Sequence, residues 1–341
     1  MNFCKLDSLP WEELQSPTRK FHSFCRNVSL ALGSPRNTGL WGGGHPFDVQ
    51  IRRIPPGAAV CPFHSHIAQS ELFVVRAGNG TVRVDDGTHS VKPGDVFYHP
   101  PGKPHQLTNA GKVDLEVLII ADNPQLDACY YPDSDKWGLR PPGKFFRMAQ
   151  CDYLDGEDAP PDPSVAPYKP APGAAPPVIT PFLQRKVSID DLPWDNFDSP
   201  KRKFRGDSKA LSEAVGAKRN TPTSLGGHPF DLELGRVPPG FSCCPFHSHV
   251  AQWEFYIFLS GQGTVRTLEG MTPVTAGDVV LHPPGEAHQF TNTGTNDLHY
   301  FLIADNPVID VWHYPDSNKM GISSPRKIFR ATDASYWDGE E

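Results

Sequence analysis

The chain has 341 residues and a formal net charge of −7 at pH 7. It contains no run of Lys and Arg, so we expect neither nucleic acid nor an anionic membrane surface as its partner. No segment approaches the roughly 18 to 20 apolar residues that span a bilayer, and the N-terminus lacks the basic start and apolar run of a signal peptide. The seven cysteines form no CxxC pair, which favours free thiols. These features predict a soluble, cytoplasmic protein.

Strand patterns dominate the chain from residue 47 onward. The only helical signal before them is one turn at residues 9–14. Alternating or apolar runs that end at Gly or Pro predict strands at 47–54, 71–78, 80–87, 95–102 and 115–122. Similar runs follow in the second half of the chain. Many short strands separated by Gly/Pro turns indicate an all-β sandwich or barrel.

The two halves of the sequence are copies of one another. "CPFHSH" at Cys61–His66 returns at Cys244–His249, 183 positions later, and the same offset relates "HPPGKPHQLTNAG" to "HPPGEAHQFTNTG". A constant offset without insertion or deletion indicates a duplicated domain. Between the copies lies a Pro/Ala-rich stretch, typical of an extended connector. We predict an N-terminal domain at 1–158, a linker at 159–183 and a C-terminal domain at 184–341.

Each copy carries a set of potential metal ligands. On a strand, residues i and i+2 point to the same face, so His64 and His66 present two imidazoles together. Glu71 begins an apolar strand, where a buried carboxylate needs a partner such as a cation. His105 follows a proline-rich corner. A lone histidine would be read as a satisfied structural residue, but the whole set recurs with identical spacing as His247, His249, Glu254 and His288.

Three imidazoles and one carboxylate suit Fe, Mn, Zn, Ni or Cu. We therefore predict one divalent transition metal in each half. The residue types alone do not choose among these metals.

At these residues the chain resembles the cupin superfamily, as a two-domain bicupin. The first cupin motif, G-x5-HxH-x3,4-E-x6-G, is matched from His64 to Gly78 and from His247 to Gly261, with its leading glycine one residue further upstream in both copies. The second motif, G-x5-PxG-x2-H-x3-N, is met from Gly94 to Asn109 and from Gly277 to Asn292. The resemblance implies two tandem jelly-roll (double-stranded β-helix) barrels, each with a metal inside held by the four ligands.

Other residues repeat or change near the ligands. His99, His282, Gln69 and Gln252 are candidates for contacts to the ligands or for the pocket wall, with a purely structural role as the alternative. Ser70 becomes Trp253 and Leu118 becomes Phe301. If these aromatic side chains point inward, the second pocket is the smaller and more apolar one.

We expect the protein to bind a small-molecule ligand or substrate. One hypothesis is a metal-dependent enzyme acting on a small oxygenated metabolite, of dioxygenase, isomerase or decarboxylase type. The alternative is a non-catalytic, metal-dependent binder of a sugar or small carboxylic acid. Two intact ligand sets speak against a storage protein. The sequence assigns no catalytic residue, and it leaves a homo-oligomer open.

Overall fold

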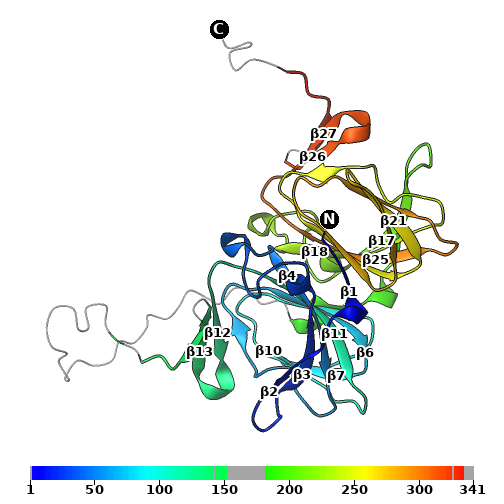
Figure 1. Ribbon diagram of the computed structural model, residues 1–341. Helices are drawn as coiled ribbons and strands as arrows, with labels where there is room; N and C mark the ends of the chain where they lie inside the picture. Colours follow the sequence, from blue (N-terminus) through cyan, green and yellow to red (C-terminus); the bar gives the residue numbers. More distant parts are fainter. Residues whose placement is uncertain (1, 141–142, 150, 152–180, 325, 334–341) are drawn as a thin grey trace, which may run out of the picture.

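The computed structural model describes residues 2–140, 143–149, 151, 181–324 and 326–333 (Figure 1). The predicted linker at 159–183 lies outside these residues, apart from 181–183. The regular elements are almost all strands, arranged in two similar halves, which confirms the predicted all-β class with duplicated barrels.

The first half is built around a seven-stranded antiparallel sheet with the order β15-β9-β6-β11-β4-β3-β2. These strands are Lys186–Ser188, Asp95–His99, Glu71–Ala77, Leu115–Asp122, Phe47–Ile54, His22–Asn27 and Glu12–Gln15. A three-stranded sheet follows, with β10 (His105–Thr108), β7 (Gly80–Val84) and β8 (Gly87–Val91). Buried side chains from both sheets form one apolar cluster, so the two sheets close over a common core.

A four-stranded sheet forms an arm beside the first barrel. Its order is β14 (Lys144–Phe146), β13 (Lys136–Arg140), β12 (Asp127–Tyr131) and β5 (Ser65–His66). Because β5 pairs with β12, the arm reaches the segment that holds the predicted histidine pair.

The second half repeats this plan. Its large sheet has the order β1-β23-β20-β25-β18-β17-β16, with strands Asn2–Lys5, Asp278–His282, Glu254–Ser260, Leu298–Asp305, Phe230–Val237, Arg205–Ala210 and Asp195–Asp198. The three-stranded sheet comprises β22 (Gly270–Thr275), β21 (Gln262–Thr267) and β24 (His288–Asn292). The arm comprises β19 (Ser248–His249), β26 (Val311–Tyr314), β27 (Lys319–Ile322) and β28 (Lys327–Phe329).

The described α-helices are two single turns, α1 (Val28–Ala31) and α2 (Leu211–Ala214). Within the described ranges, no helix has the length and apolar character required to cross a membrane. The helical turn expected at 9–14 was wrong, because Glu12–Gln15 adds to the sheet as the edge strand β2. Trp11 is held there between the guanidinium groups of Arg26 and Arg53.

The halves exchange their edge strands. β1 pairs with β23 of the second half, and β15, just after the predicted linker, pairs with β9 of the first half. Sheet membership therefore departs from the predicted ranges 1–158 and 184–341 at these two strands. A local pattern such as "NFCK" predicts a strand but not which sheet it joins.

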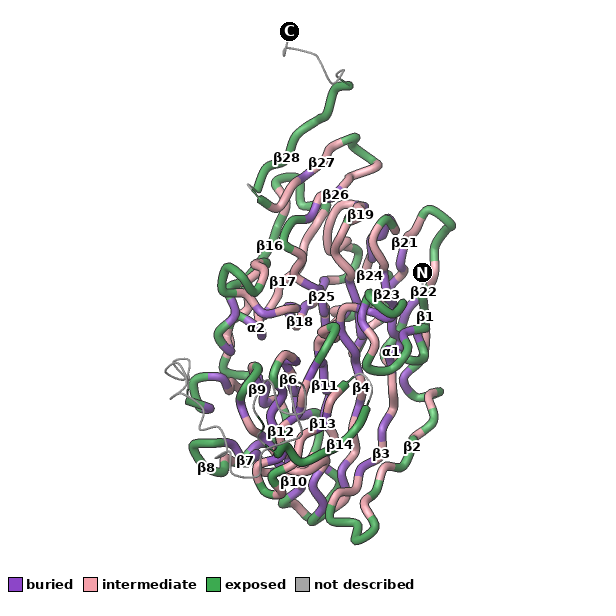
Figure 2. The backbone as a smooth tube through the Cα atoms, turned by 90° about the vertical axis from the view of Figure 1, so that its left-hand side faces the viewer, coloured by how far each residue is buried: buried purple, intermediate pink, exposed green. Residues whose placement is uncertain are grey.

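A shared core joins the halves. One buried apolar cluster contains residues of both, and the rings of Phe47 and Phe230 lie 5.9 Å apart at its centre. Two histidines flank this contact: His45 packs on Trp253, and His228 stacks on Tyr98 at 3.7 Å. Figure 2 shows buried stretches along the central strands, whereas β28 at the end of the second arm is exposed.

Candidate metal centre

The four predicted ligands of the first half lie on or directly beside the strands β5, β6 and β10. Glu71 begins β6, His105 begins β10 and His66 ends β5. His64 precedes β5 and exchanges two backbone hydrogen bonds with His105, at 3.2 and 2.8 Å. This bridge fixes the two imidazoles side by side, with ring centroids 4.7 Å apart.

The donor atoms of these side chains converge. His64 Nε2 lies 3.1 Å from His66 Nε2, and His105 Nε2 lies 2.7 Å from a Glu71 carboxylate oxygen. The same carboxylate oxygen is 3.8 Å from His66 Nε2. All three histidines are buried, and Glu71 is nearly so.

The other ring nitrogen of each histidine is already engaged. The Nδ1 partners are the Pro62 carbonyl at 2.9 Å, the Asp127 carboxylate at 2.6 Å and the Lys103 carbonyl at 3.2 Å, for His64, His66 and His105 in turn. Because these oxygens only accept hydrogen bonds, each Nδ1 carries the proton. Each Nε2 then presents a lone pair.

Three lone pairs and a carboxylate therefore point at one place, where they repel one another unless a positive charge lies between them. Without a metal, a proton on one of these groups has to supply the positive charge. Burial lowers the pKa of His66, but its hydrogen bonds to Asp127 and Cys129, together with the nearby Glu71 carboxylate, outweigh burial and raise that pKa to about 10. Burial would raise the pKa of Glu71, yet the bonded His105 and the neighbouring imidazoles hold it well below its usual range. The donor set thus fits a divalent cation with N and O ligands.

The second half repeats the arrangement. His288 Nε2 lies 2.6 Å and His249 Nε2 3.5 Å from the Glu254 carboxylate, and His247 Nδ1 is bonded to the Pro245 carbonyl at 2.9 Å. His249 Nδ1 is held by Asp310 at 2.6 Å. The buried His249 Nε2 has no hydrogen-bond partner among the described residues, which is an orphaned ligand atom that a metal would satisfy.

The two sites differ at the glutamate. The Tyr256 hydroxyl donates to the Glu254 carboxylate at 2.8 Å. Phe73 occupies the matching place in the first half and has no hydroxyl to offer. The second carboxylate therefore has one more hydrogen bond than the first.

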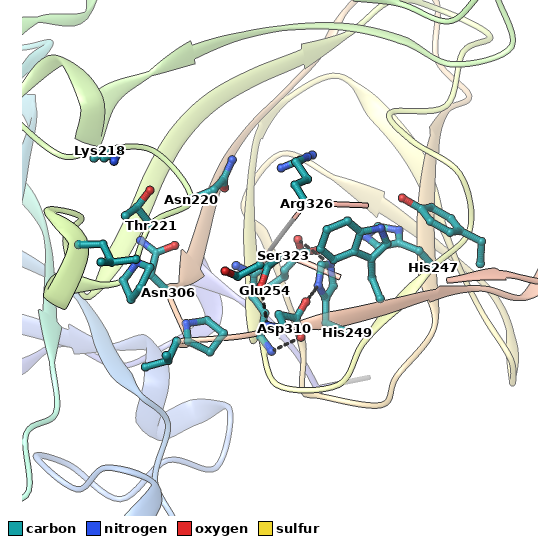
Figure 3. Close-up of a pocket in the computed structure, with 18 residues that line it drawn as sticks. Lys218, Asn220, Thr221, His247, His249, Glu254, Asn306, Asp310, Ser323 and Arg326 are labelled. Carbon is teal, nitrogen blue, oxygen red and sulfur yellow. Dashed lines mark hydrogen bonds and ion pairs between the residues drawn. The ribbon is translucent and has the colours of Figure 1, made fainter. Parts of the chain in front are cut away.

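Each donor set opens into a cavity, and the second cavity is the larger one. Its volume is about 400 Å³, against about 150 Å³ for the first. Figure 3 shows Glu254 and His249 on one side of the second cavity and Lys218 on the other. The expectation of a smaller second pocket was wrong. Trp253 packs on His45 of the other half, and Phe301 belongs to the shared core, so neither narrows the pocket.

The remaining predicted residues lie around the ligands. Gln69 and Gln252 border their cavities, but their amide groups donate to the backbone carbonyls of Asp122 and Asp305 and not to the glutamates. His99 stacks on His105 at 3.9 Å and His282 on His288 at 4.0 Å. Both lie behind a ligand rather than among the cavity-lining residues.

Sequence reasoning missed two kinds of residue. Asp127 and Asp310 orient a ligand histidine in each half, and the repeat itself could have revealed them as acids at equivalent positions. Arg52 lines the first cavity from β4, where Gly235 takes its place in the second half. Its direction follows from strand alternation, since Asp48, Gln50 and Arg52 share one face and all three line the cavity.

Comparison with known proteins finds short stretches of similarity to curated relatives. The chain is 35% identical over 68 residues to the oxalate-binding protein of Thermotoga maritima, covering 20% of this chain and 55% of the relative. It is 28% identical over 160 residues to auxin-binding protein 1 of Arabidopsis thaliana, covering 44% and 71%. The chain spans little more than half the length of the first of these relatives.

Solved structures match over most of the chain. The oxalate decarboxylase of Lactobacillus farciminis, in a formate complex, superposes with a TM-score of 0.54 at 16% identity, covering 90% of this chain and 86% of that one. A mutant of the Bacillus subtilis oxalate decarboxylase gives 0.53 at 16%, covering 91% and 78%. At this identity the likeness shows the fold alone. The Cupin domain family matches residues 50–121 and 233–304, so each half of the chain contains one cupin domain.

Proposed function

We propose that the protein is a metal-dependent bicupin enzyme that acts on a small carboxylate, with a reaction of the oxalate decarboxylase type. In this proposal each half holds one divalent transition metal. The ligands are His64, His66, Glu71 and His105 in the first half and His247, His249, Glu254 and His288 in the second.

The observation that carries the proposal is the direction of the lone pairs. In the first half, Asp127 and two backbone carbonyls hold all three Nδ1 atoms, so the Nε2 atoms face the Glu71 carboxylate. Such outer contacts fix the tautomer and orientation of metal-bound histidines. A structural role for these histidines would not require their acceptor atoms to face one another.

The comparisons support the substrate class. The two solved structures compared above are oxalate decarboxylases, one of them with formate bound, and a curated relative is an oxalate-binding protein. Another matching structure is that of the Bacillus subtilis oxalate decarboxylase with its Mn(II) centres. Manganese is accordingly the first metal to test here.

When bound, the metal supplies Lewis acidity and open positions for a carboxylate ligand. The chain's own residues hold the ion, exclude bulk water and orient the ligand. Tyr131 lines the first cavity and stacks on His64, and burial raises its pKa to about 12. Its hydroxyl therefore keeps its proton and can donate a hydrogen bond to a bound carboxylate. Tyr314 lines the second cavity at the equivalent position.

The alternative is a non-catalytic, metal-dependent binder of a small carboxylic acid. The Thermotoga maritima relative favours it, because that protein is an oxalate-binding protein. Both proposals share the metal and the ligand class. They differ only in whether the bound carboxylate reacts.

The test is metal analysis followed by a turnover assay. Protein purified in air and without oxygen should carry close to two divalent ions per chain. Iron would favour a dioxygenase, whereas manganese or zinc would favour a decarboxylase or isomerase. The Mn²⁺-loaded protein should convert oxalate to equal amounts of formate and CO₂, since the C–C bond breaks and carbon gains a proton. Metal binding without formate would favour the binder, and two sites that stay metal-free under metal excess would refute both.

The paired variants His64→Ala/His66→Ala and His247→Ala/His249→Ala serve as matched controls. Each removes two ligands from one half and leaves the other half intact. Each should therefore lose one ion per chain.

A further inference from the structure

The two barrels differ at one cross-strand pair beside the metal ligands. In the first half, Arg52 on β4 lies opposite Val117 on β11. In the second half, Gly235 on β18 lies opposite Tyr300 on β25. A Cβ atom added to Gly235 would overlap the Tyr300 ring, so the tyrosine lies across the site that the other half gives to the arginine. The first half therefore has a cationic side chain where the second half has an aromatic ring.

Arg52 is positioned by neutral groups. Its Nε donates to Gln50 Oε1 at 2.9 Å, and its Nη1 donates to the Ser23 hydroxyl at 3.1 Å. No carboxylate forms an ion pair with it within the described part of the chain. Burial lowers the pKa of Arg52, but an arginine stays charged in a protein. A charged guanidinium therefore faces the first cavity without a carboxylate in ion-pair contact, although Glu71 of the same cavity attracts it over a longer distance.

A second arginine strengthens the contrast. In the second half, Arg219 forms an ion pair with the Glu233 carboxylate at 2.5 Å. In the first half, the equivalent Arg36 lines the cavity opposite the neutral Gln50, and the described residues offer it no ion pair. Asp48 is matched by Asp231, so it does not offset this difference. At Arg36, Gln50 and Arg52, the first half is thus two charges more positive than the second half is at Arg219, Glu233 and Gly235.

We infer that the first cavity is the carboxylate-specific site, with Arg52 as the residue that anchors the anion beside the metal ligands, while the second site lacks this anchor. This inference rests on the proposed metal-bound carboxylate and deepens it. The volume of about 150 Å³ admits only a small ligand. A guanidinium binds a carboxylate through two parallel hydrogen bonds, which gives both charge and orientation. The wider second site, with Lys218 and Arg326 on its wall, is left for a bulkier ligand.

The experiment measures oxalate binding calorimetrically on Mn²⁺-loaded protein whose second site is disabled by His247→Ala/His249→Ala. In this background Arg52→Met should weaken oxalate binding about 10- to 100-fold while Mn²⁺ binding stays unchanged. Arg52→Lys should recover part of the loss. The matched control is Arg53→Met, the next residue on the same strand, which stacks on Trp11 outside the cavity and should leave oxalate binding unchanged. Neutral oxamide should bind far more weakly than oxalate.

A second experiment tests the inference without Arg52→Met, in case that variant does not fold. Protein carrying His64→Ala/His66→Ala retains only the second site and should bind oxalate at least 10-fold more weakly than the first-site protein. Equal oxalate affinity of the two sites, or wild-type affinity in folded Arg52→Met, would overturn the inference and leave the proposed function standing. Arg52-dependent binding without formate production would overturn the decarboxylase proposal alone.

Discussion

Replacing Asp127 by Asn should weaken metal binding in the first half without disturbing the backbone around it. One Asp127 oxygen accepts hydrogen bonds from the backbone N–H groups of Ala68 and Gln69 at 2.9 and 3.3 Å. The Asn carbonyl oxygen can keep these bonds. The amide nitrogen then takes the place of the other oxygen, 2.6 Å from His66 Nδ1.

Two donors would then face each other, so the proton of His66 should move to Nε2. A protonated Nε2 has no lone pair for a metal. Loss of such outer contacts typically costs 10- to 100-fold in metal affinity. This corresponds to about 1.4 to 2.8 kcal/mol for the first site. The second site, oriented by Asp310, should keep its affinity.

The assay is Mn²⁺ titration by calorimetry or by competition with a chelator, fitted to two sites. Asp127→Asn and Asp310→Asn should each weaken one site, and the double variant should weaken both. Asp133→Asn is the control, because this carboxylate belongs to the same arm but pairs with Arg83 at the surface. Two unchanged Mn²⁺ affinities in folded Asp127→Asn protein would refute the tautomer argument.

Three further predictions concern stability. Burial lowers the pKa values of His45 and His228 to about 4, so each is neutral in the folded protein and its stabilising contribution is complete above about pH 6.5. Between pH 6.5 and pH 4 the free energy of unfolding should fall by about 3 kcal/mol per histidine, because the unfolded chain takes up the protons first. In urea unfolding at pH 7 and pH 5, the His45→Gln/His228→Gln protein should therefore lose less stability than wild type. Tyr256→Phe removes a hydrogen bond to a buried carboxylate and should lower the free energy of unfolding by about 2 kcal/mol; an unchanged urea midpoint would show that this bond adds nothing. Phe47→Ala should cost about 3 to 5 kcal/mol, and the double variant with Phe230→Ala should cost less than the sum of the two singles, because both rings fill the same core; strict additivity would contradict a shared core.

Much of the fold could be predicted because its signals are local. The predicted strands at 47–54 and 115–122 have the observed bounds, since Gly, Pro and Asp residues mark their ends. The repeat carried the same assignment to the second half. The sequence could not predict that β1 pairs with β23 and β15 with β9, because these pairings depend on how the completed halves pack.

Part of the candidate metal centre could likewise be predicted from the sequence, and part could not. The spacing of the HxH pair and the later His placed the donors together, as distances of 2.7 and 3.1 Å in the first half show. The error over Trp253 was avoidable. It is adjacent to Glu254, and neighbouring positions along an extended chain face opposite sides, so a ligand pointing into the barrel implies that Trp253 points out. Arg52 was harder to find, because only the fold brings β4 beside the histidines.

The exchanged strands also set an order for folding on the ribosome. The first barrel receives its edge strand soon after the linker has been made, when Val187 meets Val96. The second barrel is completed later, because its edge strand β1 precedes both barrels in the sequence and Asn2 has no partner until Leu281 has been synthesised. A chain cut within the linker would yield two fragments, each carrying the strand that the other lacks. Neither fragment would be a complete cupin domain, and reassociation would restore both at once.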